Sequence, residues 1–173
     1  MSRASLFALV GSAFFVYWWL ADPSFEESAT QSEWKYVLGF SATLLTLASA
    51  IPVFGRTFGG RRAFIASLVA GAGTALAAVA NVFEDGLGMS WMFFVTAFGT
   101  AITLIALVSL TAAIALAGSA FQRSLALIPA ATAAGIVFFV WAGGIIMLIA
   151  WSAAAVLALP GRSPEATARC GRR

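Results

Sequence analysis

Long apolar runs separated by short polar breaks dominate the chain. They cover residues 5–20, 35–54, 63–83, 91–117 and a final uncharged stretch, 125–159. A helix needs about 20 mainly apolar residues to cross a hydrocarbon core of about 30 Å. The runs do not alternate apolar and polar positions, so strands are not indicated. The pattern therefore predicts an all-α fold, a polytopic transmembrane helix bundle.

The final stretch is too long for one crossing. Its roughly 35 residues would form a helix of about 52 Å at 1.5 Å per residue. A hairpin turning near Gly143 and Gly144 would give two short spans, 125–142 and 145–160. The alternative is one long helix with a piece that does not cross. We predict six spans, arranged as three hairpins in series, with five spans as the alternative.

Positive charge and tryptophan favour six spans and set their orientation. Arginines cluster on the cytoplasmic side of membrane proteins, and tryptophans gather at the interfaces. With six spans the inner side holds every arginine, and Lys35 is the only basic residue outside; five spans divide the basic residues evenly. Six spans also place Trp34, Trp91 and Trp141 at outer ends. The sequence thus predicts one transmembrane domain, 1–161, in a plasma (inner) membrane, with both termini cytoplasmic and a short, disordered basic tail at 162–173.

Small residues fill the third span. They recur at four-residue spacing in two rows: Ser67, Gly71 and Ala75, then Gly73 and Ala77. Such rows let a neighbouring backbone approach closely, which is a main source of helix association in lipid. We expect this span to be central and its small-residue face to bind a membrane-protein partner or a second copy of the chain.

An acidic stretch follows that span and is the best candidate for a polar or ion site. Asn81, Glu84 and Asp85 share one helix face by their spacing. Thr96 and Thr100, with Thr103, form a weakly polar stripe on the next span. We expect the Asn81 amide to find its partner at Thr96 or Thr100. The simpler interpretation is that the two acids mark the outer, hydrated end of the span.

Composition excludes most catalytic classes. The chain is 61% hydrophobic and 10% charged, whereas soluble domains carry about 25% charged residues. It has one cysteine and no histidine, so an intrachain disulfide, a histidine-based metal site and the commonest general base are all excluded. No catalytic motif occurs, and neither a cofactor, a metal nor nucleic-acid binding is predicted. Arg56, Arg61 and Arg62 are expected to contact anionic lipid head groups.

These observations predict an integral membrane protein that is not an enzyme. The favoured function is that of an accessory or scaffold subunit embedded in the lipid bilayer. The alternative is a small transporter or channel-like protein whose path follows the threonine stripe, with an outer mouth at Glu84 and Asp85. Pumps and coupled carriers usually place ionisable groups inside the membrane. The predicted spans carry none between their ends, which disfavours coupled transport.

Overall fold

The computed structural model describes residues 1–20, 34–117 and 119–159, and these residues are helical with short connections. The prediction of an all-α fold is confirmed. Four helical segments of the described chain are long and apolar enough to cross a membrane: Tyr36–Phe58, Arg61–Gly86, Ser90–Ala115 and Ala120–Val137. Trp141–Leu157 is a shorter apolar helix. A multi-pass membrane protein is therefore plausible on length and composition.

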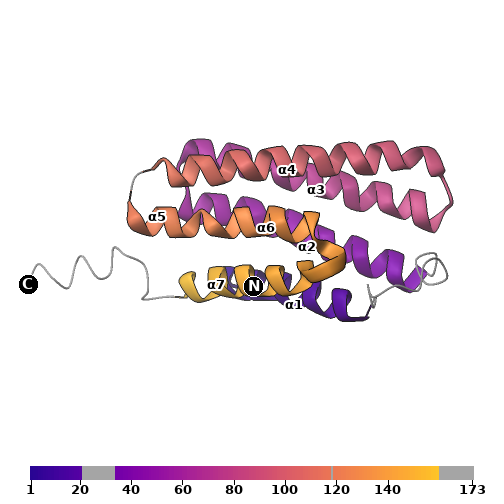
Figure 1. The fold of residues 1–173 in the computed structure, drawn as a ribbon, viewed down its shortest axis with the longest axis horizontal. Coiled ribbons are helices and arrows are strands. Elements are labelled where there is room, and N and C mark those ends of the chain that lie inside the picture. Colours follow the sequence, from indigo (N-terminus) through magenta and orange to yellow (C-terminus); the bar gives the residue numbers. More distant parts are fainter. Residues whose placement is uncertain (21–33, 118, 160–173) are drawn as a thin grey trace, which may run out of the picture.

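The helices run roughly parallel to the long axis of the molecule (Figure 1). Their order is α1 (Arg3–Leu20), α2 (Trp34–Phe58), α3 (Arg61–Asn81), α4 (Phe93–Ala115), α5 (Ala120–Leu125), α6 (Leu127–Val137) and α7 (Gly144–Leu157). Three short segments lie between these helices: the π-helical segments Val82–Gly86 and Phe139–Gly143, and the 3-10 turn Ser90–Met92.

Each helix packs against its neighbour in chain order, and the circuit closes. α1 contacts α2, α2 contacts α3, and α3 contacts α4; α4 then contacts α6, α6 contacts α7, and α7 returns to α1. In Figure 1 the α3–α4 pair lies along one edge of the bundle and the α1–α7 pair along the opposite edge. The core lies between them, and its largest fully buried side chains include Trp151, Phe7, Phe14 and Phe54.

The final apolar stretch folds as a hairpin. α6 ends at Val137, Phe138 leaves the helical conformation, and a π-helical segment leads into α7. Figure 1 shows α6 and α7 running in opposite directions. A Cβ atom built on Gly135 would lie 2.8 Å from Cγ of Met147, so the two arms are in close contact. The turn occupies residues 138–143, and Gly144 already belongs to the second arm.

α2 extends past the apolar run 35–54 and continues to Phe58, with Pro52 inside the helix. Proline removes one backbone hydrogen bond from a helix. Here α3 packs against that position: a Cβ atom on Gly71 would lie 2.7 Å from the Ala48 carbonyl oxygen and 2.9 Å from Cγ of Pro52. Tertiary packing therefore sustains α2 through the proline.

Candidate functional site

The polar residues predicted as a site lie where α3 ends and where α2 and α4 begin. Asn81 is the last residue of α3, and its side chain is buried. Its amide nitrogen Nδ2 donates to Oγ of Ser41 on α2, at 3.3 Å, and Ser41 is buried too. The expectation that Asn81 would bond Thr96 or Thr100 on the next span was wrong. The last turn of α3 faces α2 at this level, so the amide joins α2 to α3.

Glu84, rather than Asn81, forms a hydrogen bond with Thr96. It lies in the π-helical segment Val82–Gly86, which directly continues α3. The Thr96 hydroxyl on α4 donates to Oε2 of Glu84 at 2.7 Å. Glu84 is half-buried, so this carboxylate joins α3 to α4 while keeping one side in contact with solvent. π-Helical turns often occur at functional sites, and this one places the acidic pair.

Asp85 does not converge on the same point, because its side chain is exposed. Gly86, which follows it, contacts the ring of Trp34 at the start of α2: a Cβ atom there would lie 2.8 Å from ring carbons of Trp34. Gly88, with a φ of +68°, then turns the chain toward α4. The predicted site therefore divides into two separate hydrogen-bonded pairs, Asn81 with Ser41 and Glu84 with Thr96, and one solvated acid.

The threonine stripe lies at the contact between α3 and α4. Thr100 donates to the Thr96 carbonyl oxygen at 2.9 Å, and Thr103 donates to the Gly99 carbonyl oxygen at the same distance. Thr103 is buried, and its hydroxyl lies 3.2 Å from that of Thr74 on α3. Threonines in membrane helices commonly bond their own backbone in this way. The Thr103 end of the stripe therefore lies inside the contact between α3 and α4.

The small-residue face of α3 contacts helices of the same chain. Gly73 faces α4, where an added Cβ atom would lie 2.8 Å from the Gly99 carbonyl oxygen. Gly71 faces α2, as described above, and Ser67 lies against Gly55 of α2. Ala77 is buried with them, and Ala75 is half-buried. This face was expected to bind a partner protein, but α2 and α4 already occupy it.

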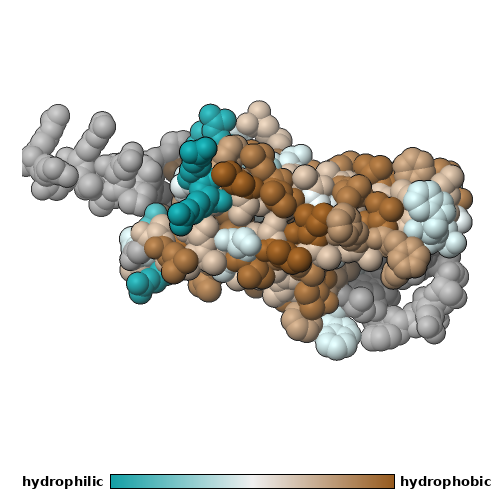
Figure 2. Space-filling model, turned by 90° about the horizontal axis from the view of Figure 1, so that it is seen from above, coloured by the Kyte–Doolittle hydropathy of each residue, from teal (hydrophilic) through white to brown (hydrophobic). Residues whose placement is uncertain are grey.

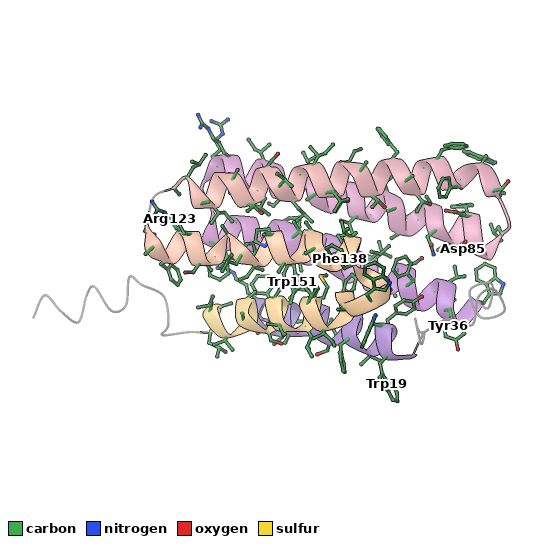
Figure 3. All side chains as sticks on the ribbon, viewed as in Figure 1. Trp19, Tyr36, Asp85, Arg123, Phe138 and Trp151 are labelled. Carbon is green, nitrogen blue, oxygen red and sulfur yellow. The ribbon has the colours of Figure 1, made fainter. Side chains whose placement is uncertain are left out.

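Arginine side chains gather at one end of the bundle, and the exposed tryptophans Trp19, Trp34 and Trp91 lie at the other. Arg3 opens α1, Arg56 lies near the end of α2, Arg61 and Arg62 open α3, and Arg123 lies on α5. The ring contact of Phe7 with Phe58, at 6.3 Å, brings the start of α1 to the end of α2. Figure 3 places Arg123 at this end, and Trp19, Tyr36 and Asp85 at the other. We call them the arginine end and the aromatic end.

The arrangement offers little for covalent or metal chemistry. Among the described residues, the only carboxylates are Glu84 and Asp85, and no group of three or more metal-ligating His, Cys, Asp or Glu side chains is present. Ser41 was missed by sequence reasoning, because it gives no signal in the sequence: serine is common in membrane helices. Arg3 and Arg123 were predicted on the same side as Arg56, Arg61 and Arg62, but not as head-group contacts.

Comparison with known proteins adds no family. No family model, curated protein or solved structure matches the chain. Its class is therefore defined by the structure alone: an all-helical protein with several helices that are long and apolar enough to cross a membrane.

Proposed function

We infer that the chain is a non-catalytic integral membrane protein of six spans that acts as an accessory or scaffold subunit. The observation that supports this best is the surface pattern. Between the arginine end and the aromatic end, the face shown in Figure 2 is a continuous band of apolar side chains. The exposed apolar side chains of α3 and α4 include Ile65, Leu68, Phe94 and Ile105. Water does not stabilise such a band, but lipid chains or another membrane helix do.

The six-span count rests on the closed circuit of helices. α1 has 18 residues and α7 has 14, which correspond to about 27 Å and about 21 Å of helix. Both are short for a core of about 30 Å. However, the two pack along each other, α1 also packs against α2, and α7 also packs against α6. Six crossings place all five described arginines on one side, and by the positive-inside rule that side is cytoplasmic.

The partner surface in this proposal is the outward face of α4. The small-residue face of α3 is occupied, so a partner has to bind elsewhere. α4 carries Phe94, Phe98, Ile105 and Val108 on one side, with exposures between 63% and 74%. Their spacing of four, seven and three residues places them along one stripe of the helix. We call these four residues the α4 outer stripe.

Replacement of Phe94 and Phe98 by alanine tests the scaffold role. Neither side chain is part of the core, so the variant should fold and insert normally. The experiment compares the mass of the full-length protein purified in mild detergent, with and without prior cross-linking in membranes. The matched control is Ile65→Ala with Leu68→Ala, which truncates two exposed apolar side chains of α3 instead.

We expect the wild type and the control Ile65→Ala with Leu68→Ala to be recovered in the same complex. We expect F94A/F98A to be recovered alone. If the wild type is recovered without any partner or second copy, the scaffold role is wrong. If the α3 control disrupts the complex as much as F94A/F98A does, the α4 outer stripe is not the partner surface.

A further inference from the structure

At the arginine end, the described residues carry positive charge and no carboxylate. Arg3, Arg56, Arg61, Arg62 and Arg123 are all exposed, and none makes an ion pair within the described residues. The described carboxylates, Glu84 and Asp85, lie at the aromatic end. Figure 2 shows strongly hydrophilic side chains grouped at one end of the apolar band, the arginine end. A concentrated set of unpaired guanidinium groups favours an anionic ligand, above all one with phosphate oxygens.

Two of these arginines adjoin exposed apolar side chains on the same helical face. Arg61 is followed on the same face of α3 by Ile65 and Leu68, which are 51% and 46% exposed. Arg123 is followed one turn later by Leu127, which is 67% exposed. At both places a phosphate-binding group thus adjoins apolar surface that runs away from it along the helix. A ligand that matches this arrangement is itself amphiphilic, with a phosphate head and hydrocarbon chains.

We propose that the arginine end binds the phosphate head groups of anionic phospholipids, with Arg61 and Arg123 as the positions that join phosphate recognition to acyl-chain contact. This deepens, and rests on, the proposed placement of the chain in a membrane. The sequence predicts head-group contact for Arg56, Arg61 and Arg62 only. The fold adds Arg3 and Arg123, because it brings the start of α1 and the α4–α5 connection to the same end.

The test measures lipid retention on the purified full-length chain. The protein is equilibrated in mixed micelles with equal amounts of phosphatidylglycerol and phosphatidylcholine, and bound lipids are counted by native mass spectrometry. Wild type should retain phosphatidylglycerol in clear excess. Each arginine near an anionic surface contributes about fivefold in affinity, so Arg61→Gln with Arg123→Gln should lower the phosphatidylglycerol affinity by roughly 25-fold. Arg61→Lys with Arg123→Lys should retain most of it, because the charge remains.

The matched control is Lys35→Gln, which removes one positive charge from the first turn of α2 at the other end. It should change the affinity by less than about twofold, because charges beyond a Debye length of about 10 Å are screened. Should the double variant not elute as a folded species, the single variants R61Q and R123Q replace it, each with about a fivefold loss expected.

Several results would overturn the proposal. Equal retention of the two lipids by wild type would remove the anionic preference. If R61Q/R123Q kept the wild-type preference for phosphatidylglycerol, or if K35Q lost as much affinity, the binding site would not be at Arg61 and Arg123. Displacement of phosphatidylglycerol by millimolar glycerophosphate would show that the head group alone is recognised and that the exposed apolar side chains have no part. Because the measurement uses the purified chain alone, it fails or succeeds independently of any complex formed through the α4 outer stripe.

Discussion

The two edge pairs of the bundle, α3–α4 and α1–α7, are both antiparallel, but the second pair packs large rings beside its glycines. α3 and α4 meet at Gly73 and Gly99, where backbone lies against backbone. α1 and α7 meet through rings: Phe7 lies 5.5 Å from Trp151, centroid to centroid, and Trp18 packs directly on Gly144. Lipid gives helices no hydrophobic reason to associate, so each pair depends on close contact. The first pair obtains it with facing glycines. The second combines rings with glycines, because a Cβ atom on Gly11 of α1 would lie 3.2 Å from the Leu148 carbonyl oxygen of α7.

This difference determines which changes each pair tolerates. The α3–α4 contact has no room for added atoms, because the atoms nearest to the two glycines belong mostly to backbone. The α1–α7 contact depends on atoms that are present, so it is sensitive to their removal. Added volume at Gly73 or Gly99 should therefore damage α3–α4, and deletion of a ring such as Trp151 should damage α1–α7. Two substitutions test this contrast and two test the hydrogen bonds at the end of α3, from the largest expected effect to the smallest.

Trp151→Ala should have the largest effect. The side chain is 2% exposed and contacts Phe7 and Phe54, so its removal leaves a large cavity. Truncation of a buried tryptophan costs about 3–5 kcal/mol. The buried indole N–H has no hydrogen-bond partner among the described residues, so Trp151→Phe removes an unsatisfied donor along with part of the ring. Trp151→Phe should cost only about 1 kcal/mol. Equal losses of unfolding free energy in the two variants would contradict the ring-packing account.

Gly99→Leu should come next, with a loss of about 1–3 kcal/mol. A Cβ atom at Gly99 would lie 2.8 Å from both the Ala77 nitrogen and the Gly73 carbonyl oxygen, so the added side chain forces the helices apart. Gly60→Leu provides the control, since nothing lies within 4 Å of a Cβ atom there. Denaturant titration in detergent micelles compares them. If the Gly99 variant were as stable as the Gly60 variant, backbone contact would not hold α3 to α4.

Asn81→Leu should cost about 1 kcal/mol, because it removes the bond to Ser41 and leaves that buried hydroxyl without its amide partner. Side-chain hydrogen bonds between membrane helices average about 0.6 kcal/mol. A double-mutant cycle with Ser41→Ala should show a coupling of that size. The same cycle with Thr96→Val should show none, since Thr96 bonds Glu84 instead. Coupling of Asn81 to Thr96 rather than to Ser41 would show that Thr96 is the hydrogen-bond partner of Asn81.

Glu84→Gln should have the smallest effect, below about 1 kcal/mol, because a half-exposed amide oxygen still accepts the Thr96 hydroxyl. The variant also tests the alternative function. In the scaffold account, proteoliposomes with wild type or with E84Q show the same background permeability to cations and small solutes. Flux in wild type that E84Q abolishes would instead support a mouth at Glu84.

The sequence predicts the fold class well, because it depends on the length and apolarity of the runs. The hairpin within 125–159 could also be predicted, since about 35 apolar residues exceed the bilayer thickness. The end of α2 could not be predicted. Local rules make Pro52 and Gly55 a stop signal, but Gly71 packs against the proline and Ser67 against the glycine. That contact joins residues far apart in the sequence.

The contacts of the candidate site could not be predicted either, because they too join residues far apart in the sequence. The spacing of Asn81, Glu84 and Asp85 correctly indicates a shared region at the end of α3, but not what each residue contacts. The rotation of α3 relative to α2 and α4 decides that Asn81 meets Ser41 and that Glu84 meets Thr96. The rows of small residues gave a similar ambiguity. Spacing indicates a close helix contact, but it cannot tell a partner within the chain from a partner outside it.

Labelling of single cysteines from one side of the membrane tests the central claim most directly. With Cys170 replaced by serine, one cysteine is introduced at Gly60, Leu87 or Ala117, in the α2–α3, α3–α4 and α4–α5 connections; a fourth protein retains only Cys170. A membrane-impermeant maleimide is applied to intact cells and then to opened ones. The account predicts that the Leu87→Cys protein reacts in intact cells and that the other three react only after opening. Labelling of Cys170 in intact cells would contradict the six-span arrangement.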